Sequence, residues 1–307
     1  MCVISITGGG VMDYYSSIKE LLINNELTHK AKDYSKNKND LNTYYEVGKL
    51  IIAAGKHYGE NVIKEYSSNL VLDVGKKYNE RTLRRMRQFY SFCEKQKWPA
   101  APAKLTISHY DELMKLKNIN EINYYINLCD KNNISSKHLR ARIKNNEYER
   151  LDEKTKNKIA RNETVELSET LKNPIIIRNT IGIEDISEKL LQKMILENLN
   201  EFLDELGEGF CYIKNEYKVK LGDNYNFIDL LLFNIKYNCY VVVELKVTEL
   251  KKEHIGQIEF YMNYIDENIK TVNQNKTIGI LVVKENNKFV IKYKTNEGIV
   301  SREYQLV

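Results

Sequence analysis

Cysteine and proline are scarce in this chain, and long apolar runs are missing from it. Its five cysteines are scattered over 307 residues and none lies in a CxxC motif, which argues against a cysteine metal site or a disulfide framework. This usage is typical of a reducing compartment, so we expect a cytoplasmic protein. No apolar run approaches the roughly 18 residues that a membrane-spanning helix needs. The first eleven residues carry no targeting signature, and we expect residues 1–11 to be a loose extension.

The charge balance is slightly basic. The chain has 47 Lys and Arg against 42 Asp and Glu, for a formal net charge of +5. This small excess fits an anionic partner such as a nucleic acid but does not identify one. The length allows two domains, each with its own core.

The pattern of apolar residues divides the chain in two. Residues 12–150 place apolar residues at intervals of three and four, which predicts a helical N-terminal domain. The basic helix described below leads us to expect that this domain binds nucleic acid or a partner. Gly59 and Gly75 stand where helices should end, and Asn79 is placed to cap the next helix. The polar stretch 151–173 is interpreted as a linker before a second domain at 174–307.

The second half alternates between strand and helix patterns. Residues 186–209 predict one long amphipathic helix and 253–269 a second helix. Strands are expected at 210–222, 226–235, 239–247, 277–284 and 288–294. This order indicates an α/β or α+β domain, a mixed sheet flanked by helices.

Two acids interrupt apolar strands in this half. In YVVVELKV (240–247), Glu244 and Lys246 share the strand face opposite Val243 and Leu245. Asp229 lies inside the preceding strand, NFIDLLLF, and two adjacent strands could bring it beside Glu244. Such close carboxylates repel each other unless a cation intervenes, and oxygen ligands of this kind suit Mg²⁺ or Mn²⁺. The pattern alone leaves a structural Glu–Lys pair equally open.

The stretch NFIDLLLFNIKYNCYVVVELKV followed by GQIEFYMNYID resembles the PD-(D/E)XK nuclease superfamily, in its YhcG-type branch. The N-terminal segments YGENVIKEYSSNL, NERTLRRMRQFY and LTISHYDELMKLKN resemble the helical domain of that branch. The resemblance implies a restriction endonuclease-like core, with Asp229 and Glu244 as metal ligands helped by the Leu245 carbonyl. It implies that Lys246 positions the attacking water.

Further residues are assigned through the same resemblance. Glu197 occupies the place of an additional acidic metal ligand, and Gln257 and Tyr261 match a polar pair on the following helix. Gln257 is then expected to contact the water or the substrate backbone, and Tyr261 the nucleic acid. Ile228 stands where the superfamily motif has its proline.

A basic helix is predicted in the N-terminal half. In ERTLRRMRQFY, we predict that Arg81, Arg84, Arg85 and Arg87 contact nucleic acid. Phosphates attract such side chains through counterion release. The alternative is a solvated charged face. An apolar stripe is expected on the opposite side, formed by Leu83, Met86, Tyr90 and Cys93.

Together these patterns predict a metal-dependent nuclease. The resemblance favours DNA over RNA as the substrate, in defence against foreign DNA or in DNA repair. A homodimer is expected, because two copies of one site can cut both strands, and restriction or defence proteins are candidate partners. The alternatives are a non-catalytic binding or assembly protein on a nuclease scaffold, and an RNA-cleaving enzyme.

Overall fold

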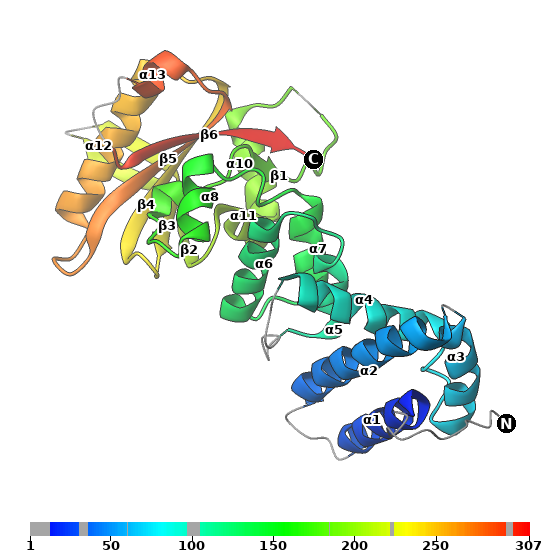
Figure 1. Cartoon of the computed structure of the whole chain (residues 1–307). Coiled ribbons are helices and arrows are strands. Elements are labelled where there is room, and N and C mark those ends of the chain that lie inside the picture. The colour runs from blue at the N-terminus through cyan, green and yellow to red at the C-terminus, as the bar shows by residue number, and fades with distance from the viewer. Residues whose placement is uncertain are drawn as a thin grey trace. The chain divides into compact units, whose positions relative to one another are not determined.

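The computed structural model describes residues 13–30, 36–59, 61–96, 105–183, 185–221, 224–292 and 297–307. The expected extension at residues 1–11 lies outside these ranges. The chain forms two compact units, Met1–Asn145 and Asn146–Val307. The first is helical and the second contains the sheet (Figure 1).

The helical unit contains seven described helices. They are α1 (Tyr14–Lys30), α2 (Lys36–Tyr58), α3 (Val62–Asp73), α4 (Glu80–Gln96), α5 (Ile107–Leu113), α6 (Ile119–Asn132) and α7 (Ser136–Lys144). Gly59 and Gly75 follow α2 and α3 with φ of +81° and +156°, and the Asn79 side chain accepts a hydrogen bond from Thr82 N at 3.1 Å before α4. The helix ends predicted here are confirmed.

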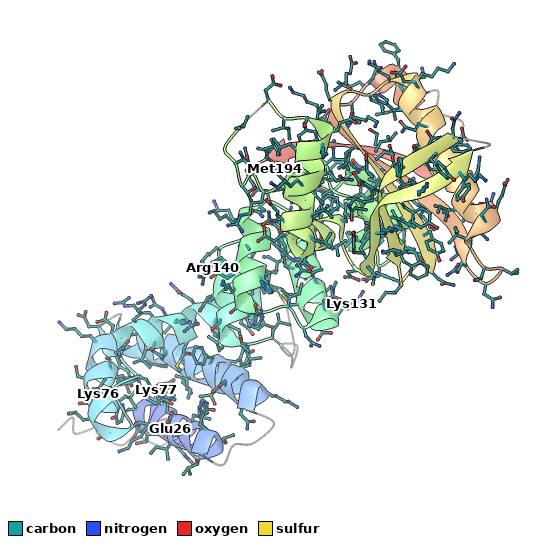
Figure 2. The ribbon with its side chains drawn as sticks, turned by 180° about the vertical axis from the view of Figure 1, so that it is seen from behind. Glu26, Lys76, Lys77, Lys131, Arg140 and Met194 are labelled. Atoms are coloured by element: carbon teal, nitrogen blue, oxygen red, sulfur yellow. The ribbon has the colours of Figure 1, made fainter. Side chains whose placement is uncertain are left out.

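The close approach of α2 to α4 depends on Gly48. A Cβ atom at this position would lie 2.2 Å from the Met86 carbonyl oxygen and 2.7 Å from Tyr90 Cβ. Glu26 fastens α1 to the segment before α4, because it pairs with Lys77 and accepts a 2.5 Å hydrogen bond from the Tyr78 hydroxyl (Figure 2).

The second unit is built on a six-stranded mixed sheet of order β1-β6-β5-β4-β3-β2. The strands are β1 (Ile175–Ile177), β2 (Phe210–Leu221), β3 (Asn224–Asn234), β4 (Cys239–Glu249), β5 (Asn275–Glu285) and β6 (Ile299–Leu306). Strands β1, β6, β5 and β4 run parallel to one another. Strand β3 is antiparallel to β4, and β2 is antiparallel to β3. The mixed sheet flanked by helices confirms the predicted fold class.

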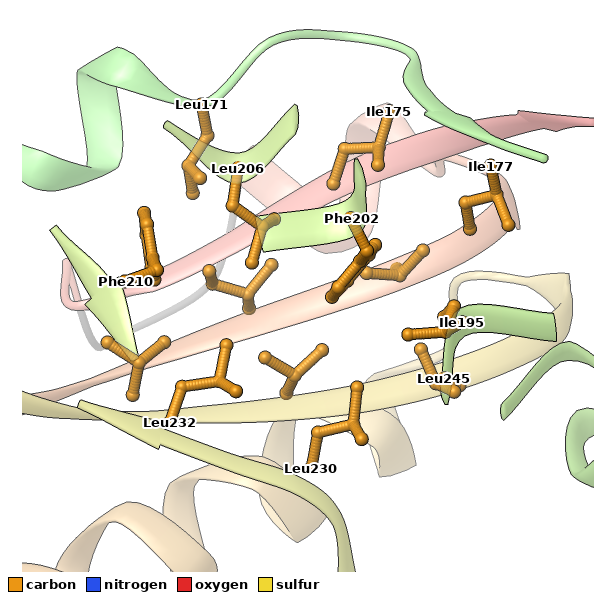
Figure 3. Close-up of a cluster of buried hydrophobic side chains, with 14 of the residues drawn as sticks. Leu171, Ile175, Ile177, Ile195, Phe202, Leu206, Phe210, Leu230, Leu232 and Leu245 are labelled. Atoms are coloured by element: carbon orange, nitrogen blue, oxygen red, sulfur yellow. The ribbon is translucent and has the colours of Figure 1, made fainter. Parts of the chain in front are cut away.

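Helices cover both faces of this sheet. On one face, α10 (Glu188–Glu197) and α11 (Leu199–Leu206) pack on alternate residues of β3 and β4 such as Leu230, Leu232 and Leu245 (Figure 3). On the other face, α12 (Lys252–Asn268) packs on Leu231, Val242 and Leu281. Because adjacent strand residues serve different layers, β4 is buried on both sides.

The secondary structure departs from the prediction at three places. The expected long helix is divided at Asn198, whose φ of −123° and ψ of 38° are not helical. The strand expected at 288–294 is wrong over its described part, because Lys288–Lys292 form the short helix α13 and Asn287 Oδ1 accepts hydrogen bonds from Phe289 N and Val290 N. Residues 293–294 lie outside the described ranges. Strands β1 and β6 were not predicted.

The polar segment 151–173 contributes α8 (Glu153–Ala160) and α9 (Leu167–Thr170) to the second unit. Charged residues in and next to this segment form ion pairs. Lys172 is 2% exposed and lies 3.9 Å from both Glu147 and Glu205, and Arg150 pairs with Glu205. In the parts of the chain that the structure describes, no helix is long and apolar enough to cross a membrane.

Candidate active site

The candidate site lies where β3 and β4 separate. Their register runs from Asn234↔Cys239 to Leu230↔Val243, so Asp229 and Glu244 are next in line. There the carboxylates accept backbone hydrogen bonds: Asp229 N donates to Glu244 Oε1 at 3.2 Å, and Leu245 N donates to Asp229 Oδ2 at 2.8 Å. The structure therefore brings together the two acids that the sequence singled out.

Burial makes this pair of acids electrostatically unfavourable. Glu244 is 1% exposed. Burial and the neighbouring Asp229 charge raise the pKa of Glu244 to about 8. Burial also raises the pKa of Asp229, although the Leu245 N–H favours its ionised form. A bound cation would relieve both penalties.

Lys246 supplies one positive charge beside the pair. Its Nζ lies 3.5 Å from Glu244 Oε2 and 3.5 Å from Glu188 Oε2. Burial disfavours the ammonium form, but Glu244, Glu188 and Asp229 outweigh that effect and raise the pKa of Lys246. The lysine is therefore a cation at neutral pH.

Two residues of α10 were missed by the sequence reading. Glu188 stands in the first turn, after the capping residue Ser187. Gln192, one turn further and 8% exposed, donates from Nε2 to the Asp229 carbonyl oxygen at 3.0 Å. The four-residue spacing of Glu188 and Gln192 on one helix face was visible, but the way α10 docks on the sheet was not.

Glu197, the acid predicted as an additional ligand, lies at the other end of α10. It follows Glu188 by nine positions, which is about 14 Å along a helix. Its carboxylate accepts a hydrogen bond from Thr180 Oγ1 at 3.2 Å and lies 3.9 Å from Lys193 Nζ. The structure thus places Glu197 apart from Asp229 and Glu244, and Glu188 near them.

Helix α12 adds polar groups to the neighbourhood. Gln257 Nε2 donates to the Tyr261 hydroxyl at 3.2 Å, as expected for a pair one turn apart. Tyr261 is 3% exposed, and burial raises its pKa, with Glu244 and Asp229 adding to that effect. Burial and then Lys246 lower the pKa of His254, which favours a neutral ring. The Tyr261 ring is therefore buried, and its hydroxyl is the group that contacts Gln257.

The donor set fits a hard divalent cation. No group of three or more His, Cys, Asp and Glu side chains suited to a metal is found in the described ranges. The site offers the carboxylates of Asp229 and Glu244, with the Leu245 carbonyl as a further predicted ligand. Magnesium is commonly held by one or two carboxylates, with water and substrate phosphate completing its shell.

The arginines of α4 are partly engaged within the helical unit. Arg84 pairs with Glu80 at 2.6 Å, and the Arg85 guanidinium forms two hydrogen bonds to the Asp111 carboxylate of α5. Arg81 is exposed. A phosphate would compete with existing ion pairs at Arg84 and Arg85.

The opposite side of α4 is buried. Leu83, Met86 and Cys93 lie in the interior, whereas Tyr90 is half-buried and Phe89 is 1% exposed. Arg87 is half-buried and lines a cavity of about 190 Å³ with residues of α2 and α3. The apolar stripe is confirmed, with Phe89 contributing more than Tyr90.

The chain matches two protein families, one in each half. Residues 21–150 match the DUF1016 N-terminal domain, and residues 168–306 match the YhcG PDDEXK nuclease domain. The protein named "Putative nuclease YhcG" of Escherichia coli (strain K12) is 24% identical over 285 residues, covering 79% of this chain and 76% of that protein.

Solved structures resemble parts of the chain more remotely. A repair endonuclease from Pyrococcus abyssi shares 23% identity, with a TM-score of 0.28, over 41% of this chain and 48% of its own. The structure titled "Structure of EndoMS-dsDNA2 complex" shares 21% identity, with a TM-score of 0.29, over 42% and 48%. The match spans about half the length of each solved chain.

The two domain matches together cover most of the chain in the order expected from its sequence, and the second contains Asp229, Glu244 and Lys246. The chain therefore carries a DUF1016 N-terminal domain followed by a YhcG PDDEXK nuclease domain, and it is a distant homologue of the putative nuclease YhcG.

Proposed function

We propose that the second unit hydrolyses phosphodiester bonds of DNA with the help of Mg²⁺ or Mn²⁺. One observation carries this proposal: Asp229 and Glu244 lie side by side at the separation of β3 and β4, with a lysine ammonium at 3.5 Å. Two carboxylates this close destabilise the fold when both are ionised, and a non-catalytic scaffold would gain nothing from that cost.

Each residue has a chemical role in this proposal. Asp229 and Glu244 would hold the ion, which when bound polarises a phosphoryl oxygen and lowers the pKa of water. Lys246, oriented by Glu188 and Glu244, donates hydrogen bonds to the attacking water or to the charge that develops on the phosphate. Gln257, held by the Tyr261 hydroxyl, contacts the substrate backbone.

The substrate class rests on family analogy and on charge. DNA is proposed because the superfamily that the chain resembles acts mostly on DNA. The exposed Arg81 and the net charge of +5 support a polyanionic partner. A homodimer, and an action in defence or repair, remain part of the same proposal.

The test is cleavage of duplex, single-stranded and branched DNA and of RNA, each with Mg²⁺, Mn²⁺ or EDTA. Metal-dependent cutting that is lost in both Glu244→Gln and Lys246→Ala supports the proposal and identifies the substrate. Binding without cutting, unchanged by either variant, would instead favour a non-catalytic nucleic-acid-binding protein.

The chain contains its own matched control. Glu249-Leu250-Lys251 repeats the tripeptide Glu244-Leu245-Lys246, but Glu249 and Lys251 are exposed, and Glu249 accepts a hydrogen bond from Asn287. We expect Glu249→Gln and Lys251→Ala to retain cleavage. Loss of cleavage in these variants as well would show that the assay reports general charge effects and not the site.

A further inference from the structure

The outer arm formed by β2 and β3 has two different faces. On one face Val219 and Ile228 are fully buried among residues that pack with α12. Because strand residues alternate between faces, their neighbours Lys218, Lys220 and Phe227 point the other way, and all three are exposed. The arm therefore presents one covered face and one open face.

The open face combines aromatic rings with ammonium groups. Tyr225 is 49% exposed and Phe227 is 51% exposed. Lys220 pairs in register with Tyr225, and Lys218 pairs with Phe227. Lys218 Nζ also lies 3.5 Å from the centroid of the Tyr225 ring, so a positive charge is held against an exposed ring.

This open face begins next to the candidate active site. Phe227 precedes Asp229 by two residues on β3, a distance of about 7 Å along a strand. Strand β2 is at the edge of the sheet. A strand of nucleic acid whose phosphate lies at Asp229 and Glu244, and which runs along β3 toward the β2–β3 turn, would have its neighbouring nucleotides beside Phe227 and Tyr225.

We propose that Lys218, Lys220, Tyr225 and Phe227, here called the hairpin platform, bind unpaired nucleotides of the substrate next to the bond that is cleaved. This inference rests on the proposed function of the Asp229–Glu244 site. Exposed rings stack on the faces of unpaired bases, and flanking lysines attract the phosphates between them. In a duplex the base faces are already stacked on each other, so only the lysines of the platform would contribute to duplex binding.

The first test measures affinity without catalysis. A fluorescein-labelled single-stranded DNA of mixed sequence and its duplex form are titrated with the full chain in EDTA, and anisotropy is recorded. We expect Tyr225→Ala and Phe227→Ala each to weaken single-strand binding by about 5- to 100-fold, with a smaller effect on the duplex. Phe227→Leu keeps an apolar side chain but removes the ring, and should also weaken binding.

The matched control is Phe289→Ala, which removes a phenylalanine that is 77% exposed on α13. It should bind single strands like the wild type. Lys218→Ala and Lys220→Ala should each reduce the salt dependence of binding, because each removes one phosphate contact.

The second test separates the platform from the active site. Hydrolysis of bis-p-nitrophenyl phosphate with Mn²⁺ needs the site, but this small diester has no nucleotides next to the bond that is cleaved, so Tyr225→Ala and Phe227→Ala should retain it. If the wild type hydrolyses nothing while single-strand binding still depends on the rings, the proposed catalysis fails and the platform stands. If the wild type cleaves DNA and both ring variants bind single strands normally, the platform is overturned.

Two further outcomes would also overturn the inference. An equal loss of single-strand and duplex binding would indicate a general phosphate surface. A change in sedimentation behaviour, with nucleic-acid affinity unchanged, would indicate that the rings form a protein interface.

Discussion

Replacing Glu244 by glutamine should stabilise the cation-free protein at alkaline pH while abolishing its proposed activity. The carboxylate is 1% exposed and lies beside Asp229. Burial and the Asp229 charge raise its pKa from 4.5 to about 8. The folded state therefore holds this proton more tightly than the unfolded chain does.

The sign and size of the effect follow from this difference. Because folding raises the pKa of Glu244, its contribution to the free energy of unfolding is fully present below pH 4.5 and is lost as the pH rises through about 8. A pKa change from 4.5 to about 8 corresponds to about 5 kcal/mol of unfolding free energy. Glutamine avoids that loss but deprives Lys246 of one partner, which costs on the order of 2 kcal/mol. At about pH 8.5 in EDTA we expect Glu244→Gln to be more stable than the wild type by about 3 kcal/mol.

The assay is thermal unfolding of both proteins in EDTA at pH values from about 6 to 8.5, with Glu249→Gln as the control. Each kcal/mol corresponds to about 2–4 °C in Tm for a domain of this size. The difference in Tm between Glu244→Gln and the wild type should grow with pH. Any effect of His254 is common to both proteins and cancels in this difference. A variant that is equally or less stable than the wild type at about pH 8.5 would refute the electrostatic reasoning.

A divalent cation should reverse the order. Ligand at about 1,000 times its Kd adds about 4.1 kcal/mol to the stability of the protein that binds it, which exceeds the lead of about 3 kcal/mol expected for the variant. The wild type should gain this stabilisation from Mg²⁺ or Mn²⁺, and Glu244→Gln should gain much less. Equal stabilisation of both would place the cation elsewhere.

Three other predictions concern the rest of the chain. Gly48→Ala should destabilise the helical unit by about 1–3 kcal/mol, because the added Cβ would meet the Met86 backbone. Gly55→Ala, whose Cβ would meet open space on the same helix, should stabilise the unit by about 0.5–1 kcal/mol. Urea unfolding measures both changes. Arg85→Ala should lower the Tm of the helical unit even without nucleic acid, since it breaks the pair with an acid of α5, and an unchanged Tm would contradict a structural role. Glu188→Gln should lower kcat/KM for DNA cleavage about 10- to 100-fold by freeing the site lysine, and an unchanged rate would remove Glu188 from the site.

The sequence by itself determined the strands that carry the site. Alternation in YVVVELKV placed Glu244 and Lys246 on one face, and the structure has both buried within 3.5 Å of each other. An acid inside each of two consecutive apolar strands predicted a close pair, because antiparallel neighbours are separated by about 5 Å. Local capping signals such as Asn79 were equally readable, since a cap involves residues only three or four positions apart.

Only the tertiary structure decided which distant groups join these strands. The acid of α10 that reaches Lys246 is Glu188 and not Glu197, because the docking of the helix on the sheet selects which of its turns faces the site. The helical pattern of 186–209 continues through Asn198, yet the chain breaks there to pack two short helices on the sheet. The sequence of the polar segment 151–173 is indistinguishable from that of a linker. Only the structure shows that Lys172 lies beside Glu147 and Glu205, which are distant in sequence. In each case the deciding contact joins residues far apart in sequence, and no local pattern encodes such a contact.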